Sequence, residues 1–169
     1  MVDAGILSEN DRVELIYGEV LALSPIGPRH CASVDRTLRL MVNLTGENAI
    51  VRIQGSVGLD EYNEPQPAIV LMRPREDFYA SKHPGPSDIL LIIEVAESSL
   101  QYDRGVKASL YADMAIVEYW VLDLKNSTLF AYSNPSEKSY RVVRPFHRGD
   151  VIAPSLLPDC RIEVDALLP

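Results

Sequence analysis

The stretch ILLIIEVAESS, Ile89 to Ser99, decides the fold of this chain. A continuous apolar run of this kind is typical of a strand that other elements cover on both faces. Glu94 interrupts the run near its end, and an unpaired carboxylate in such a strand costs several kcal/mol or becomes protonated. Two interpretations are open: Glu94 reaches solvent at the strand end, or the interior of the protein holds it for a purpose.

Lys107 favours the second interpretation and indicates a site shared with Glu94. It belongs to a predicted helix, Asp103 to Met114, and stands three residues before the next member of the helix's apolar stripe. That stripe consists of Leu110, Tyr111 and Met114. Because residues at this spacing share one helix face, Lys107 points inward with the stripe. The alternative is a lysine that extends past the helix edge and pairs with Asp103 one turn earlier.

A carboxylate at a strand end with a nearby lysine suits phosphodiester hydrolysis. The carboxylate is an oxygen ligand of the kind that Mg²⁺ prefers, and the lysine stabilises negative charge on the phosphate. A second carboxylate is expected on the adjacent strand, predicted at Ala68 to Met72 within NEPQPAIVLMRP, but that strand begins with Ala68. Glu64 lies about 13 Å from Ala68 along an extended chain and is too distant to replace the missing group.

Turn and cap residues divide the rest of the chain into short elements. Tyr17-Gly18 predicts a hairpin, Pro28 the start of a helix and Gly46 its end. The predicted elements are strands Val13 to Ile16 and Val20 to Leu23, helix Arg29 to Leu44, strands Ala49 to Ile53, Ser56 to Leu59 and Glu118 to Leu122, and a terminal meander of Leu129 to Tyr132 and Tyr140 to Val143. No repeat or interdomain linker is found, so one domain of residues 1–169 is expected. The order of elements predicts a mixed α/β sheet with at least one crossover.

Composition narrows the classes of function. The chain has 169 residues, of which 47% are hydrophobic, and a net charge of −8. That charge argues against a general nucleic-acid binder, because non-specific affinity comes mostly from Lys and Arg residues that neutralise phosphates. Any DNA contact therefore needs a local basic rim, for which Arg73, Arg75 and Lys82 are candidates, and we expect it to be weak and salt-dependent. Solvated loop charges are the simpler interpretation of these residues.

The cysteines and the hydropathy indicate a location in the cell. Cys31 and Cys160 have no metal-ligand spacing and are expected to be reduced, as in a cytoplasmic protein. No window approaches the apolar length of a membrane span, and the first residues lack the basic-then-apolar pattern of a signal peptide. We therefore expect a cytoplasmic protein without a membrane-spanning segment.

Nearly the whole chain resembles the Uma-type restriction endonucleases, a family abundant in bacteria and placed in the PD-(D/E)XK nuclease superfamily. The similar stretches are DRVELIYGEVLALSPIGPRH, NEPQPAIVLMRPREDFYASKHPGPSDILLIIEVAESSLQYDRGVK and YADMAIVEYWVLDL. The resemblance implies a restriction-endonuclease-like core, DNA as the substrate and Mg²⁺ or Mn²⁺ as the cofactor. In that family the superfamily lysine has moved to the helix after the strand, which fits Ala96 after Val95 and Lys107 further on.

The resemblance also implies roles for particular residues. Glu94 and the carbonyl of Val95 would be metal ligands, and Lys107 would be the catalytic lysine. Glu14 and His30 match the family's N-terminal pattern, and we expect them, with Asp103, beside these groups. The family pattern has Pro-Asp where this chain has Pro67-Ala68, so position 68 is a vacated ligand position.

Two classes of function remain open. The first is a metal-dependent DNA endonuclease that Ala68 weakens or silences. The second is a non-catalytic scaffold or binding protein that keeps the nuclease fold, for which a homodimer is one arrangement. Calorimetry with Mg²⁺ and Mn²⁺ separates them, because the first class should give heat of binding and the second should give none.

Overall fold

The central sheet has six strands. The computed structural model describes residues 11–169, and the irregular start expected for the chain lies mostly outside them. The strands, in their order across the sheet, are β3 (Ile50–Ile53), β4 (Ile69–Met72), β5 (Ile89–Ala96), β6 (Glu118–Asp123), β7 (Thr128–Ser136) and β8 (Ser139–Phe146). The pair β5 and β6 is parallel, and the other neighbouring pairs of this sheet are antiparallel. The predicted mixed α/β sheet with a terminal meander is therefore confirmed.

Strand β5 lies inside the sheet, and every one of its residues is buried. Ile93 lies opposite Ile69 of β4 on one side and opposite Trp120 of β6 on the other. The predicted pairing of these strands is thus confirmed, although β4 begins at Ile69, one residue later than expected. Because successive side chains of a strand point to opposite faces, Ile93 and Glu94 lie on different sides of the sheet.

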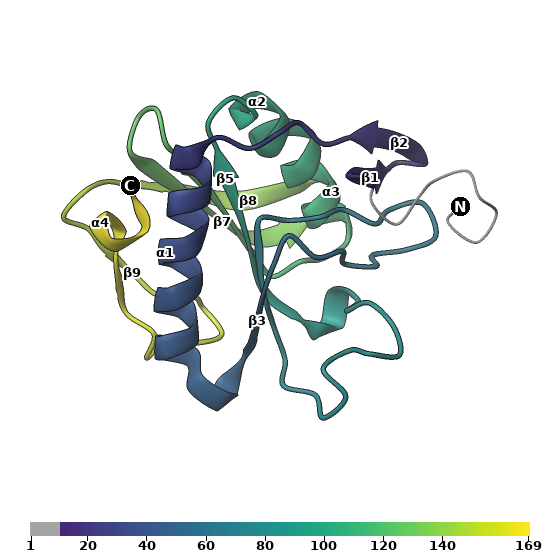
Figure 1. Ribbon diagram of the computed structural model, residues 1–169, viewed down its shortest axis with the longest axis horizontal. Helices are drawn as coiled ribbons and strands as arrows, with labels where there is room; N and C mark the ends of the chain where they lie inside the picture. The colour runs from purple at the N-terminus through teal and green to yellow at the C-terminus, as the bar shows by residue number, and fades with distance from the viewer. Residues whose placement is uncertain (1–10) are drawn as a thin grey trace.

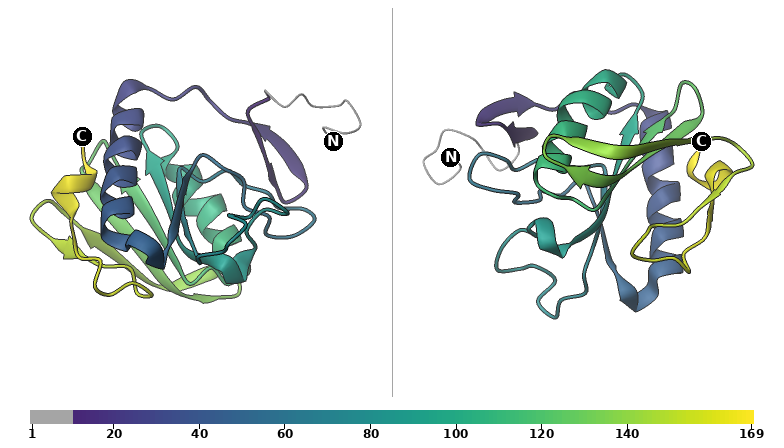
Figure 2. Two further views of the ribbon diagram at one scale, coloured as in Figure 1. Left: turned by 60° about the horizontal axis from the view of Figure 1, so that its bottom comes forward. Right: turned by 180° about the vertical axis from the view of Figure 1, so that it is seen from behind.

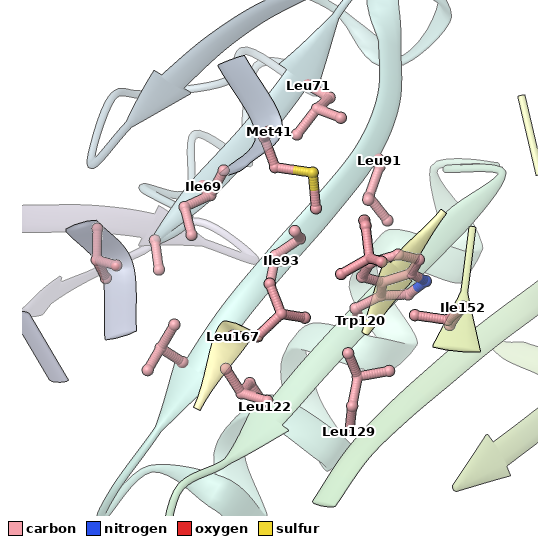
Figure 3. Packing of buried hydrophobic residues seen from close by; sticks show 14 of the residues in the cluster. Met41, Ile69, Leu71, Leu91, Ile93, Trp120, Leu122, Leu129, Ile152 and Leu167 are labelled. Carbon is pink, nitrogen blue, oxygen red and sulfur yellow. The ribbon is translucent and has the colours of Figure 1, made fainter. Parts of the chain in front are cut away.

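One face of the sheet is covered by α1 (Pro28–Thr45) and by the end of the chain. Figure 1 shows α1 crossing in front of the sheet with the C-terminus beside it. The C-terminal elements are β9 (Val151–Ile152), β10 (Ile162–Glu163) and α4 (Val164–Leu167). Figure 3 shows the packing on this face, where Met41 of α1 meets Ile69, Ile93 and Trp120 of the sheet, all fully buried. The residues of this cluster are apolar, so we call it the dry face, although Nε1 of Trp120 donates to the buried carboxylate of Glu118 at 2.7 Å.

The opposite face is covered by the crossover segment between β5 and β6. Figure 2 shows this segment and α1 on opposite sides of the sheet. The segment consists of α2 (Leu100–Tyr102), the π-helical turn η3 (Asp103–Lys107) and α3 (Ala108–Asp113). Four tyrosines, Tyr111, Tyr119, Tyr132 and Tyr140, pack on this face with neighbouring ring centroids 4.9–6.4 Å apart. Because Glu94 and Lys107 also lie here, we call it the charged face.

Helix α1 begins and ends where its cap residues predict. Pro28 occupies the first helical turn, in which a missing backbone N–H costs nothing. Gly46 follows the last residue with a φ of +51°, a conformation that favours glycine, and its N–H donates to the carbonyl of Val42. The short 3₁₀ turns η1 (Gly46–Asn48) and η2 (Pro86–Asp88) lead into strands β3 and β5. No helix in residues 11–169 is long and apolar enough to cross a membrane.

The predicted N-terminal hairpin is present and stands apart from the main sheet. It consists of β1 (Val13–Ile16) and β2 (Glu19–Ala22), joined by Tyr17 and Gly18, both with positive φ as in a two-residue hairpin turn. Leu15 and Glu64 exchange backbone hydrogen bonds at 3.2 and 2.8 Å, which attaches the hairpin to the loop before β4. This attachment decides where the side chain of Glu14 points.

Two parts of the sequence prediction were wrong or incomplete. Ser56 to Leu59 is a loop and not a strand. Its backbone bonds go to three separate loop residues, Pro65, Pro84 and Asn63, and not to one partner strand. Burial of Val57 and Leu59 explains the error, since alternating apolar residues imitate a strand pattern. Strands β9 and β10 and helix α4 were not predicted, because two-residue strands leave no periodicity to detect.

Candidate active site

The floor of the candidate site is the end of β5, where Glu94 faces the start of β4. Ile69 lies opposite Ile93 in the register, which brings Ala68 opposite Glu94. The N–H of Ala68 donates to Oε2 of Glu94 at 3.0 Å. Both residues line a pocket of about 470 Å³, whose lining also includes residues 21–27, the end of β2 and the chain that follows it. The position that the sequence indicated for a second carboxylate therefore borders Glu94 and the pocket.

Lys107 reaches Glu94 from the crossover segment. Its Nζ donates to Oε1 of Glu94 at 2.9 Å, and the two residues are only 4% and 5% exposed. The π-helical turn buries Asp103 and Lys107 at its two ends while the three residues between them are exposed. The predicted contact of Glu94 with Lys107 is therefore confirmed, and Lys107 does not extend past the helix edge to solvent.

Glu14 and Asp103 complete a buried group of three acids around one lysine. Oε2 of Glu14 lies 3.1 Å from Nζ of Lys107, so the ammonium bridges Glu14 and Glu94. Asp103 is 3% exposed and its carboxylate accepts a hydrogen bond from the hydroxyl of Ser99 at 2.6 Å. The ion pairs of Lys107 are thus with Glu14 and Glu94, and not with Asp103 one turn earlier.

The charges of the group shift the pKa values of Lys107 and Asp103. Burial alone would lower the pKa of Lys107, but attraction by Glu94, Glu14 and Asp103 outweighs burial and raises it, so the lysine is charged. Burial and then repulsion by Glu94 raise the pKa of Asp103 to about 7. Asp103 therefore exchanges its proton near neutral pH, and the group carries one or two net negative charges depending on that proton.

His30 and Val95 also line the pocket. Burial lowers the pKa of His30, although Glu94 and Glu97 act in the opposite direction. The imidazole that shares the pocket with Val95 is therefore mostly neutral at neutral pH.

The described side chains do not fit a divalent cation. Oε1 of Glu94 accepts hydrogen bonds from Lys107 and from the Tyr111 hydroxyl at 3.3 Å, and Oε2 accepts one from Ala68. A hard cation needs several oxygen ligands that no donor already occupies. Within residues 11–169, no group of three or more His, Cys, Asp or Glu side chains is arranged to hold a metal ion. Position 68, where a ligand would complete the set, carries a methyl group and directs an N–H at Glu94.

The basic residues considered for DNA contact lie at the other end of strand β4. Arg73 directly follows β4, whereas Ala68 directly precedes it, which separates them by about 16 Å of extended chain. Arg75 forms an ion pair with Asp77 at 2.7 Å, and Lys82 is exposed in the same loop. None of these three basic side chains lines the pocket, so they do not rim the candidate site directly.

Sequence reasoning missed two tyrosines that contact the acids. Tyr111 donates to Glu94, and its own pKa is raised by burial and then by Glu94, so it stays a donor. Tyr102 donates to Oε1 of Glu14 at 3.3 Å, and its ring centroid lies 5.8 Å from Nζ of Lys107. Tyr111 could have been found, because it follows Lys107 by four residues on the same helix stripe. Tyr102 could not, since its contact depends on where the hairpin docks.

A solved structure shares this arrangement of elements. It is described as a putative nuclease belonging to DUF820 from Anabaena variabilis, and it matches with a TM-score of 0.74 at 14% sequence identity. The match covers 98% of this chain and 94% of the other. At this identity the likeness concerns the fold alone. No curated protein sequence matches the chain.

The sequence itself settles the family. Residues 5–165 match the family model Uma2, which is described as "Putative restriction endonuclease". The match includes the hairpin, both strands that meet at the pocket and the crossover segment with Lys107. The chain therefore belongs to the Uma2 family.

Proposed function

We propose that the end of β5 is a nuclease site for DNA phosphodiesters, and that Ala68 silences or strongly weakens it. Glu94 and Lys107 are the residues to which we assign the chemistry. In phosphodiester hydrolysis the site must orient water and stabilise negative charge that develops on the phosphate. Lys107 is the cation positioned to do so, but its ammonium is shared between Glu94 and Glu14.

The observation that carries this proposal is the contact between position 68 and Glu94. The backbone N–H of Ala68 lies 3.0 Å from a carboxylate oxygen of Glu94, at the border of a pocket that both residues line. An aspartate at position 68 would bring a second carboxylate beside the first. Two adjacent carboxylates are the ligand type that Mg²⁺ and Mn²⁺ prefer. An ion that the added charge attracts would displace donors of Glu94, and it would supply charge neutralisation and an activated water.

The test is nicking of supercoiled plasmid DNA by the Ala68→Asp variant in the presence of Mg²⁺ or Mn²⁺. We expect nicking by Ala68→Asp, little or none by the native chain, and loss of nicking when Glu94→Gln is added. Ala68→Asn is the matched control, because it has the same size without the charge. A folded Ala68→Asp variant that does not cut DNA would contradict the proposal and favour a non-catalytic role.

The same proposal includes a weak electrostatic contact with DNA. Arg73 and Lys82 are exposed in the loop between β4 and β5, whereas Arg75 is partly neutralised by Asp77. With two or three phosphate contacts, the logarithm of the affinity should fall against the logarithm of salt with a slope of roughly −2 to −3. Fluorescence anisotropy with a labelled duplex measures this slope, and tight binding that ignores salt would contradict it.

A second candidate function is a non-catalytic binding protein, for which a homodimer is one arrangement. The poor fit of the described side chains to a divalent cation favours it. Failure of Ala68→Asp to bind metal would leave this function as the remaining one. For either function we propose a cytoplasmic location, because Cys31 and Cys160 are both free thiols.

A further inference from the structure

We propose that Lys107 is the resident cation of the site, and that the native chain neither needs nor binds a divalent metal there. The family resemblance implies a divalent ion, whereas the side chains present in this chain do not fit one. The proposal rests on the same residues as the proposed function. Its test uses the native chain without DNA, so that failure of one proposal can be told from failure of the other.

The first support is the position of the ammonium. Nζ of Lys107 lies 2.9 Å from Glu94 of β5 and 3.1 Å from Glu14 of β1, so two separate elements supply the carboxylates. A cation that bridges two buried carboxylates neutralises their repulsion, as a bound metal ion does. Lys107 therefore already provides the charge that would attract a metal to this position.

The second support is the way in which the remaining oxygen positions are filled. Tyr111 donates to Oε1 of Glu94, and Tyr102 donates to Oε1 of Glu14. The backbone N–H groups of Ala68 and Gln66 donate to the Oε2 atoms of Glu94 and Glu14, the latter at 3.4 Å. Each carboxylate thus forms an ion pair with the lysine and accepts a hydrogen bond from a tyrosine and from a backbone group. A metal ion would have to displace these donors, and their loss would cost buried hydrogen bonds.

The third support is the balance of charge. Three buried acids, Glu14, Glu94 and Asp103, surround a single buried cation. Removal of the lysine would leave these acids uncompensated in the interior, which is far more destabilising than removal of an exposed lysine. The same removal would also open oxygen positions on two carboxylates. A chain without Lys107 should therefore acquire the metal response that the native chain lacks.

The experiment compares melting curves of the native chain and of Lys107→Met in EDTA and in millimolar Mn²⁺. The single tryptophan, Trp120, is fully buried and reports unfolding by its fluorescence. We expect no Mn²⁺ shift for the native chain. We expect Lys107→Met to melt roughly 10 °C lower in EDTA, and Mn²⁺ to restore about half of that loss. Lys125→Met is the matched control, because Lys125 is exposed, and it should change little.

Two further measurements make the outcome decisive. Adding Glu94→Gln to Lys107→Met should abolish the Mn²⁺ response, which shows that the ion binds at this site. Titration calorimetry of Mn²⁺ into the native chain should give no heat, and this result stands even if Lys107→Met fails to fold. Heat of binding that Glu94→Gln removes from the native chain would overturn the proposal. A folded Lys107→Met variant that ignores Mn²⁺ would overturn it as well.

Discussion

The two faces of strand β5 differ in what holds them together. On the dry face, Ile93 packs with Met41 and Trp120, and all three are fully buried. On the charged face, the next residue, Glu94, is almost as buried but is held by Lys107, Tyr111 and the backbone of Ala68. Contacts on the first face depend on volume and those on the second on charge and direction. Neighbouring residues of one strand therefore belong to an apolar core on one face and to the candidate site on the other.

The largest effect should come from the dry face. Ile93→Ala removes three buried carbon atoms and leaves a cavity between the sheet and α1, so we expect the free energy of unfolding to fall by roughly 3–4 kcal/mol. Because Ile93 packs among apolar residues, the loss should be nearly the same at pH 5 and pH 8. Urea unfolding at both pH values measures it. A loss of stability that depends on pH would contradict the distinction between the two faces.

The matched control for this substitution is Val117→Ala. Val117 is 40% exposed, so that its truncation leaves no cavity and should cost less than about 0.5 kcal/mol. A cost close to that of Ile93→Ala would mean that the measured losses do not report burial on the dry face.

A smaller effect, the dependence of stability on pH, should come from the carboxyl group of Asp103 on the charged face. The pKa of its carboxyl is raised to about 7 in the folded protein, above its value of 3.8 when unfolded. Between these two values the folded state binds the proton more strongly, so stability falls as the pH rises toward 7. Asp103→Asn removes this dependence and still offers an oxygen to Ser99.

We therefore expect the native chain to lose about 2–3 kcal/mol more than Asp103→Asn between pH 5 and pH 8. Chemical unfolding of both proteins at several pH values measures the difference. Asp165→Asn is a suitable control, because hydrogen bonds from Gly149 and Arg148 lower the pKa of Asp165. Its contribution is lost only as the pH falls, outside this range. Parallel pH profiles for the native chain and Asp103→Asn would show that Asp103 does not titrate as its surroundings indicate.

The sequence could predict local features on both faces of β5, but it could not predict a contact between distant segments. The apolar run around Ile93 predicts an interior strand because burial on both faces leaves a plain compositional signal. Lys107 was predicted beside Glu94 because helix periodicity decides which face a residue occupies. The contact of Glu14 with Lys107 could not be predicted from periodicity. It depends on the backbone pairing of Leu15 with Glu64, a long-range contact with no local pattern.

The Ser56 to Leu59 loop and the C-terminal segment show the same limit elsewhere in the fold. Apolar alternation predicts burial correctly for Val57 and Leu59, but pairing needs a partner strand, which alternation does not supply. Separate hydrogen bonds attach the C-terminal segment to the rest of the chain. Ser155 donates its backbone N–H to the buried Glu118 at 2.6 Å, and Ser33 of α1 donates its hydroxyl to the carbonyl of Leu167. Such contacts become visible only in three dimensions.

The central claim is that position 68 is the missing half of a site that Glu94 still occupies. Titration calorimetry of Mn²⁺ into Ala68→Asp and Ala68→Asn, with melting curves to show that both are folded, tests it most directly. We predict that Ala68→Asp binds a single Mn²⁺ ion, that Ala68→Asn binds none, and that Glu94→Gln removes binding from the aspartate variant. Equal binding by both variants, or no binding by a folded Ala68→Asp, would contradict the claim.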